Sequence, residues 1–225
     1  MSAIAKINHD TKSITISATL NFYGSFAEPI LAEKIILEIN TLWNEPKAIF
    51  EVNELPYEVI FSIDYVCHSA ETILEKCISN LSYAENFIRI EEKNTAERSM
   101  MGFGIGQNSG HWLITDNLGE STTAAHEFGH AIGLPHPDHL DYRNTGLPPI
   151  MAPRGTLVDA QYQWNPLAET GSYGGTMRPI WRRVRDYEIV AVLRPFDLAD
   201  VSEINIGSLT NNLYDEIGRP VGIIS

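Results

Sequence analysis

The sequence of 225 residues is 44% hydrophobic and 20% charged, a composition that excludes the disordered and fibrous classes of protein. Its formal net charge of −13 at pH 7 disfavours nucleic acid and anionic membranes as main partners, because phosphate binding needs a surface rich in Lys and Arg. We expect one globular domain over residues 1–225 that acts as a monomer and is not inserted in a membrane.

The first part of the chain alternates between strand and helix patterns. Apolar residues occupy every second position over 14–22, which predicts a strand with one buried face. Apolar residues at helical spacing predict a helix over 28–44, with Pro29 in its first turn and Pro46 beyond its end. Alternation returns over 57–65 and predicts a second strand.

Shorter elements follow this strand. Ser69 is a suitable N-cap for a short helix. Short strands are predicted over 86–91, 99–105 and 111–116. Because the strands precede a histidine-rich helix, residues 1–133 are expected to form an N-terminal α/β lobe. The apolar residues assigned to the short helix are Ile73, Cys77, Ile78 and Leu81.

The sequence beyond this lobe is dense in Pro, Gly and Asn and predicts irregular loops in a C-terminal lobe, residues 134–225. One helix is predicted over 180–193, where Pro195 ends the apolar pattern. A β-hairpin is expected around DEIGR, residues 215–219. The residues expected on the buried side of the helix are Ile180, Val184, Tyr187 and Ala191.

The stretch HEFGHAIGLPH, residues 126–136, has the spacing of a metal site. On a helix, His126 and His130 lie four residues apart and project from one face, so both imidazoles can reach one ion. Gly133 can adopt a positive φ and end the helix, which allows His136 to approach from another direction. Three neutral imidazoles leave a fourth position for water, the arrangement typical of catalytic zinc.

The alternative interpretation is that these histidines are ordinary core or surface residues. A short H-E-x-x-H pattern leaves that interpretation open. The longer pattern with a Gly and a third His is much stricter, since a random chain of this length matches it on the order of once in a hundred thousand.

The pattern H-E-x-x-H-x-x-G-x-x-H, with a downstream methionine in PPIMAPRG, resembles the signature of the metzincin zinc peptidases. The resemblance covers about residues 99–155. It implies an α+β fold with a twisted, mostly parallel sheet, an antiparallel edge strand, and helices above an irregular C-terminal subdomain. It also implies that Met151 forms a turn beneath the three histidines, whereas the alternative is a methionine packed in the lower lobe.

The branch of this family is less well defined. Pro137, after the third histidine, is most similar to the serralysin branch. However, the first tyrosine after the methionine is Tyr162, much later than in serralysins, and the calcium-binding glycine repeats of that branch are missing. The wider matrixin-like group is therefore the better comparison, and a tyrosine close to the metal is doubtful.

The resemblance implies hydrolysis of peptide bonds by a water that Zn²⁺ activates, with Glu127 as the general base. It further implies that a protein or peptide substrate lies extended along an edge strand, which we assign to residues 99–105. Substrate-binding residues are expected in this strand and in the wall after Met151, although the aromatic ones are equally suited to a core. They are Met101, Gly102, Phe103, Gly104, Tyr162, Trp164 and Tyr173.

Other polar residues have plainer interpretations. His139 competes with His136 as third ligand, but the glycine spacing favours His136, and His111 is expected to face the surface or substrate. Cys67 and Cys77 are expected to be reduced thiols, because two cysteines are too few for a disulfide-based fold. A basic cluster is expected to be a solvated helix face: Arg178, Arg182, Arg183 and Arg185.

The two ends of the sequence bear on where the protein acts. The N-terminus lacks the pattern of a Sec signal peptide, so we expect a soluble chain made in the cytoplasm and, if exported, carried by a non-Sec route. The segment NNLYDEIGRPVGI is similar to the Y-D-x-x-G-R pattern of bacterial YD-repeat toxin shells, which would make the chain a toxin or effector protease. A simple hairpin is the other interpretation.

Three functions remain open at this point. The first is a zinc endopeptidase. The second is a zinc-bearing module that binds a partner's peptide without cutting it, which the intact Glu127 disfavours. The third is a zinc hydrolase that acts on a bond other than a peptide bond.

Overall fold

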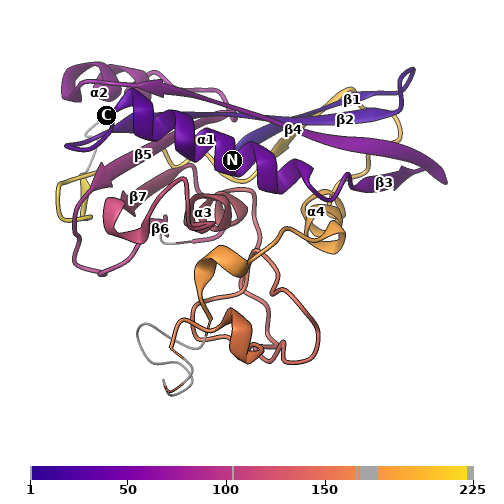
Figure 1. Ribbon diagram of the computed structural model, residues 1–225. Coiled ribbons are helices and arrows are strands. Elements are labelled where there is room, and N and C mark those ends of the chain that lie inside the picture. The colour runs from indigo at the N-terminus through magenta and orange to yellow at the C-terminus, as the bar shows by residue number, and fades with distance from the viewer. Residues whose placement is uncertain (1, 103, 166, 168–176, 222–225) are drawn as a thin grey trace.

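The structure, a computed structural model, describes residues 2–102, 104–165, 167 and 177–221 and has a mixed α+β architecture (Figure 1). A curled, mostly parallel sheet with antiparallel parts forms the upper layer, and irregular loops lie below it. The helices in the described residues are α1 (Pro29–Asn44), α2 (Ala70–Ile78), α3 (Thr123–Ala131) and α4 (Asp186–Leu193). The strands there are β1 (Ala3–Asn8), β2 (Ser13–Tyr23), β3 (Ile49–Val52), β4 (Leu55–Cys67), β5 (Glu85–Glu91), β6 (Met100–Met101), β7 (Ser109–Leu113), β8 (Glu203–Ile206), β9 (Leu213–Tyr214) and β10 (Pro220–Val221).

The main sheet has the strand order β3-β4-β2-β5-β7-β6. The pairs β2–β4, β2–β5 and β5–β7 are parallel, whereas β3 and β6, at the two ends, pair antiparallel with their neighbours. β1 pairs antiparallel with the first half of β2 and with β8. The chain after residue 203 therefore returns to the sheet of the N-terminal half.

Helix α1 lies along one face of this sheet and packs against β4 and α3 (Figure 1). Its buried stripe includes Ile35, Ile39 and Trp43, each fully buried. Two side chains of α1 also satisfy the backbone of β4: Asn40 bonds to the amide and carbonyl of Ile63, and Asn44 does the same at Phe61. Because these bonds fix α1 against the strand, α1 is a rigid support for α3.

The sequence correctly predicted the central elements. The expected strands over 14–22, 57–65 and 86–91 correspond to β2, β4 and β5, and the expected helix over 28–44 corresponds to α1. The hairpin around 215–219 is also confirmed, since β9 and β10 pair antiparallel on either side of it.

The short helix was predicted correctly only in part. The Ser69 hydroxyl accepts a hydrogen bond from the Thr72 amide at 3.3 Å, so the predicted cap is confirmed. Ile73 and Cys77 are buried as expected. The inclusion of Ile78 and Leu81 in the apolar face was wrong: α2 ends at Ile78, and both side chains are exposed.

The strands near the histidines are shorter than predicted. Of the expected strand 99–105, only β6 pairs with β7, because Gly102 adopts a φ of +64° and turns the chain away. The expected strand 111–116 is shifted toward the N-terminus as β7, and Ile114–Asp116 forms a 3-10 turn.

The helix predicted over 180–193 was wrong in its first half. Pro179–Trp181 is a 3-10 turn, and α4 begins only after Arg185, whose extended backbone (φ −114°, ψ 148°) stops the helix from continuing backward. The buried face is accordingly different. Ile180, Tyr187 and Ala191 are not buried and Val184 is buried outside the helix, whereas Ile189, Val192 and Leu193 fill the helical core positions.

The lower loops have a small core of their own, formed by Ala152, Val158 and Met177, against which Tyr142 and Tyr162 pack. Among the described residues, no helix combines the length and apolar character needed to cross a bilayer.

Candidate metal centre

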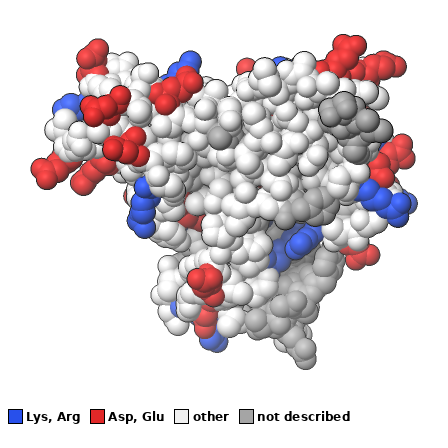
Figure 2. Space-filling model, turned by 180° about the vertical axis from the view of Figure 1, so that it is seen from behind, with Lys and Arg blue, Asp and Glu red and all other residues white. Residues whose placement is uncertain are grey.

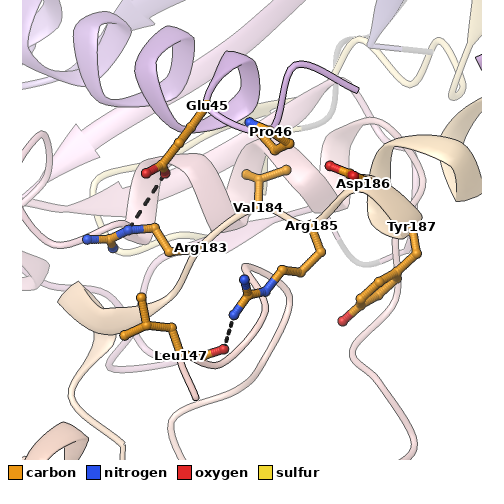
Figure 3. A pocket seen from close by; sticks show the side chains of 8 residues that line it. All are labelled: Glu45, Pro46, Leu147, Arg183, Val184, Arg185, Asp186 and Tyr187. Atoms are coloured by element: carbon orange, nitrogen blue, oxygen red, sulfur yellow. Dashed lines mark hydrogen bonds and ion pairs between the residues drawn. The ribbon is translucent and has the colours of Figure 1, made fainter. Parts of the chain in front are cut away.

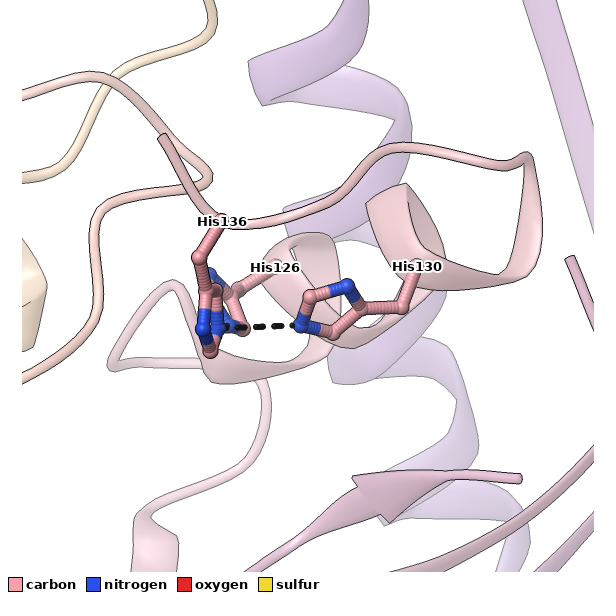
Figure 4. Close-up of side chains that lie close together, drawn as sticks. All are labelled: His126, His130 and His136. Atoms are coloured by element: carbon pink, nitrogen blue, oxygen red, sulfur yellow. Dashed lines mark hydrogen bonds between the residues drawn. The ribbon is translucent and has the colours of Figure 1, made fainter. Parts of the chain in front are cut away.

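The three histidines of the motif converge on one point. His126 and His130 project from α3, and His136 comes back from the loop that follows the helix (Figure 4). The Nε2 atom of His136 lies 3.2 Å from Nε2 of His126 and 3.1 Å from Nε2 of His130. Gly133, with a φ of +99°, provides the predicted reversal of the chain between them.

The other nitrogen of two of these rings is held by the backbone. His126 Nδ1 donates to the carbonyl of Ile150 at 2.7 Å, and His130 Nδ1 donates to the carbonyl of Leu134 at 2.8 Å. A carbonyl can only accept, so Nδ1 carries the proton in both rings and each Nε2 presents a lone pair. Such a second contact is what fixes the tautomer and direction of histidine ligands in metal sites.

Lone pairs that point at one another repel, whereas a metal ion between them can accept all of them. His136 has a single ring proton and cannot satisfy two neighbouring lone pairs equally. Ligand nitrogens about 2.0–2.1 Å from a tetrahedral zinc lie about 3.3 Å apart, close to the separations found here. The cluster could therefore hold one metal ion between these three rings.

Burial keeps the rings neutral, the state that a ligand requires. His126 is almost fully buried, and burial places its pKa well below the ordinary value. Burial likewise lowers the pKa of His130, and that of His136 to about 4. Imidazoles in this state can bind a cation at neutral pH without first losing a proton.

Helix α3 is held at its N-terminus by a carboxylate from α1. Thr122, the N-cap residue, has a φ of +67° and its side chain does not cap the helix. Instead, the Glu38 carboxylate accepts hydrogen bonds from the amides of Ala125 (3.1 Å) and Ser121 (3.2 Å). A negative group at this end also interacts favourably with the helix dipole, so Glu38 replaces the missing cap.

The turn with Met151 packs directly against α3. Met151 is 2% exposed, and a side chain at Gly129 would overlap its sulfur atom. The absence of a side chain at Gly129 thus permits the close approach of the methionine. The Glu188 carboxylate of α4 fixes the turn by accepting hydrogen bonds from the backbone amides of Ile150 (3.2 Å) and Met151 (3.0 Å).

Glu127 follows the first ligand and is 6% exposed at the wall of a cleft. Burial raises the pKa of its carboxyl to about 8, although the nearby Arg182 opposes this. Arg182 itself is buried and donates to the Thr122 hydroxyl at 3.0 Å and to the Ala152 carbonyl at 3.3 Å. The described residues supply no hydrogen bond to the Glu127 carboxylate, which leaves it available to a bound molecule.

The cleft in front of the histidines has a volume of about 640 Å³. Its upper wall is the chain around β6 and its lower wall is the loop after Met151. Of the predicted substrate-binding residues, Met101, Gly102 and Gly104 line it together with Glu127 and the histidines. Phe103 lies outside the described residues.

Of the three aromatic residues considered for the wall of this cleft, Tyr162 and Trp164 are not among those that line it. Tyr162 packs in the core of the lower loops and against Trp181, with ring centroids 5.5 Å apart. Trp164 lines a separate pocket that includes Asn117 and Arg178. The third aromatic, Tyr173, lies outside the described residues.

The remaining histidines and the cysteines lie apart from the cluster. His139 bonds to the Asp141 carbonyl, which agrees with the choice of His136 as ligand. The surface or substrate-facing role expected for His111 was wrong, because its side chain is fully buried beside Asn94, at 3.1 Å, under the C-terminal hairpin. Cys67 and Cys77 are free thiols, as expected.

The basic cluster is not a solvated helix face. Arg182 is buried, Arg183 and Arg185 attach the segment before α4 to its surroundings, and Arg178 is exposed at another pocket. Figure 3 shows this at a pocket of about 480 Å³, where Arg183 pairs with Glu45 at 3.6 Å and Arg185 donates to the Leu147 carbonyl. The pocket lies away from the histidines.

Sequence reasoning missed Glu38 and Glu188, and it assigned the buried Arg182 to a solvated surface. A signal existed for Glu38, because it interrupts the apolar stripe of α1, where a polar residue must find a buried partner. Glu188 and Arg182 gave no comparable sign of burial in the sequence. Both lie in a segment where the helix begins later than the apolar pattern predicts.

Comparisons with known proteins do not assign the chain to a family. No family model matches it, and no curated protein matches it significantly. The chain is a mixed α+β protein with a curled, mostly parallel sheet and a cluster of three histidines that could bind a metal ion.

Proposed function

We propose that the protein is a zinc-dependent endopeptidase of the metzincin type. The observation that carries this proposal is the convergence of three Nε2 atoms beside a buried carboxylate on one wall of a cleft. The histidines are His126, His130 and His136, and the carboxylate is that of Glu127. The motif resemblance supports the same function, and the buried methionine turn beneath the helix is consistent with it.

The donor set favours zinc over other biological cations. Neutral imidazoles suit Zn²⁺, whereas Mg²⁺ and Ca²⁺ prefer oxygen ligands. When bound, zinc would polarise the scissile carbonyl and lower the pKa of a water molecule toward neutrality. His126, His130 and His136 would hold the ion, and the Ile150 and Leu134 carbonyls would keep the first two rings aimed at it.

The chain's own contribution to the reaction is proton transfer. With a dication bound beside it, the Glu127 carboxyl would ionise, because a nearby positive charge lowers its pKa. The carboxylate would then accept a proton from the attacking water and deliver it to the nitrogen of the departing amine. Its position on α3, one residue after His126, places it beside the ligands without making it one of them. Burial in the cleft wall excludes competing water from this carboxylate.

The substrate would bind as an extended strand along β6. β6 is the last strand in the sheet order, and it forms the upper wall of the cleft near Met101. An extended peptide could pair with this edge by main-chain hydrogen bonds, which gives affinity without demanding one side chain. The peptide would then cross the cleft in front of Glu127 and the histidines.

Metal content and peptide cleavage test the proposal together. The purified chain should contain one zinc per molecule and cleave members of a random peptide library, and a chelator should abolish cleavage. Glu127→Gln should keep the zinc and lose about 10²–10⁴-fold in kcat/KM, because only the proton-transfer group is removed. His130→Ala should lose the zinc itself.

The other candidate functions give different results. Stoichiometric zinc and tight peptide binding without cleavage would indicate a recognition module. Stoichiometric zinc with no activity on any peptide would indicate a hydrolase for another bond. A chain that binds no zinc under conditions that retain it in a known zinc peptidase would disprove the proposal.

A further inference from the structure

The cleft of the proposed peptidase has basic side chains in its wall, although the whole chain is acidic. Arg98, Arg154 and Arg182 line it, against a formal net charge of −13 for the protein. Figure 2 shows Lys or Arg side chains in the hollow between the upper body and the lower loops, whereas most acidic side chains lie toward the edges of that view. The local charge of the cleft therefore differs from that of the surface.

Two of the three arginines are engaged within the protein. Arg154 forms an ion pair with Asp116, which also accepts hydrogen bonds from the Ser99 amide (2.9 Å) and hydroxyl (2.8 Å). Arg182 is buried and bonds to Thr122 and to the carbonyl of residue 152. Neither guanidinium has its full hydrogen-bonding capacity free for a ligand.

Arg98 differs from both of these residues. Its backbone is held in place by two contacts. Its carbonyl accepts a hydrogen bond from the side-chain amide of Asn94 at 2.8 Å, and the backbone amide of the following residue, Ser99, donates to Asp116. Its side chain is exposed, and the described residues provide it with no hydrogen bond or ion pair. Glu97, which also lines the cleft, is likewise exposed and forms no ion pair with it.

The position of Arg98 relates it to the reaction site. It lines the same cleft as Glu127, His130 and His136, where the peptide bond would be cut. It lies two residues before Met100, the first residue of β6, whose backbone would pair with the substrate. A fixed backbone with a free guanidinium is well suited to bind a planar carboxylate in two parallel hydrogen bonds.

We propose that Arg98 is a specificity-determining residue that binds a carboxylate of the substrate, and that the protein selects peptides with Asp or Glu close to the scissile bond. This proposal rests on the function proposed above. The acidic surface would repel such peptides weakly at long range, because salt at 0.15 M screens charges beyond about 8 Å. Within the cleft, the contact with Arg98 would decide the preference.

Paired peptides test this selectivity. Each pair has blocked termini and differs only by Glu or Gln at one position near the cleavage site. We expect wild type to prefer the Glu peptide by about tenfold in kcat/KM at one position, as one charge-assisted hydrogen-bonded contact would give. In Arg98→Gln the preference should fall to about twofold or less. Arg194→Gln, which removes an exposed arginine at the end of α4, should keep the wild-type ratio.

A binding measurement separates this proposal from the peptidase proposal. Fluorescence anisotropy measures the binding of labelled Glu and Gln peptides to the Glu127→Gln protein. This protein should bind the Glu peptide more tightly than the Gln peptide, and the double variant Glu127→Gln, Arg98→Gln should lose that preference. If no peptide is cut, the peptidase proposal fails while this measurement still tests Arg98.

A third peptide has Gln at the varied position and a free C-terminus. It shows whether Arg98 binds a side-chain carboxylate or the terminal carboxylate of the peptide. A preference for this peptide that is lost in Arg98→Gln supports carboxylate binding by Arg98, with the terminus as its target. Equal binding of all three peptides by wild type, or a preference that persists in Arg98→Gln, would overturn the proposal.

Discussion

The Glu188 carboxylate of α4 accepts a hydrogen bond from the backbone amide of Met151 at a distance of 3.0 Å. The same carboxylate accepts the amide of Ile150, and the carbonyl of Ile150 accepts the Nδ1 proton of His126. A single acidic side chain of α4 is thus connected, through one peptide unit, to the orientation of a candidate metal ligand.

This carboxyl group should make stability depend on pH. Burial raises the pKa of Glu188 to about 7 from an ordinary value of 4.5, so the folded state holds its proton in a range where the unfolded state has lost it. Stability from this group is complete below pH 4.5 and is lost as the pH rises through 7. At 1.36 kcal/mol per pKa unit, the loss is on the order of 3 kcal/mol.

Urea unfolding of the metal-free protein between pH 4 and 8 measures this effect. The difference in unfolding free energy between wild type and Glu188→Gln should fall as the pH rises, because glutamine keeps the shape but cannot ionise. A difference that stays constant over this pH range would show that Glu188 does not titrate as described.

Removal of the Glu38 carboxylate should destabilise α3. Glu38→Ala leaves the buried amide of Ala125 and the partly buried amide of Ser121 without their acceptor, a change that typically costs about 1–3 kcal/mol. Glu33→Ala is the matched control, since Glu33 lies on the exposed face of the same helix. Chemical unfolding should separate the two variants by at least about 1 kcal/mol; equal stabilities would rule out the capping role.

The contact between Gly129 and Met151 predicts a coupled pair of substitutions. Gly129→Ala should cost about 1–3 kcal/mol by overpacking, because the new methyl group would overlap the methionine sulfur. In a Met151→Ala background the same change should cost much less. Gly133→Ala provides the control: it is strained by its φ of +99° but meets no neighbour, so it should show no coupling to Met151.

The third ligand can be distinguished from its neighbour by metal binding. Zinc should raise the thermal midpoint of wild type, since a ligand that binds only the folded state stabilises it by about 4 kcal/mol at 1,000 times its Kd. His139→Ala should behave like wild type, because His139 bonds only to a backbone carbonyl. His136→Ala should lose most of the zinc-dependent shift. A full shift in His136→Ala would remove this residue from the ligand set.

The sequence alone determined the central sheet, α1 and the set of converging histidines. Strict alternation specifies which face of β2 is buried, and helical spacing places His126 and His130 on one side of a turn. These features depend on local periodicity, which is why they could be predicted. The break at Gly133 and the return of His136 depend on one backbone angle that glycine tolerates.

Only the tertiary structure decided which charged residues are buried and what they hold in place. Glu38 and Glu188 are far from the histidines in sequence, yet their carboxylates fix the two backbone segments that orient α3 and its first ligand. Tertiary packing also placed Tyr162 and Trp164 outside the lining of the cleft. Such contacts join residues tens of positions apart, and no local pattern in the chain records which distant amide a buried carboxylate will meet.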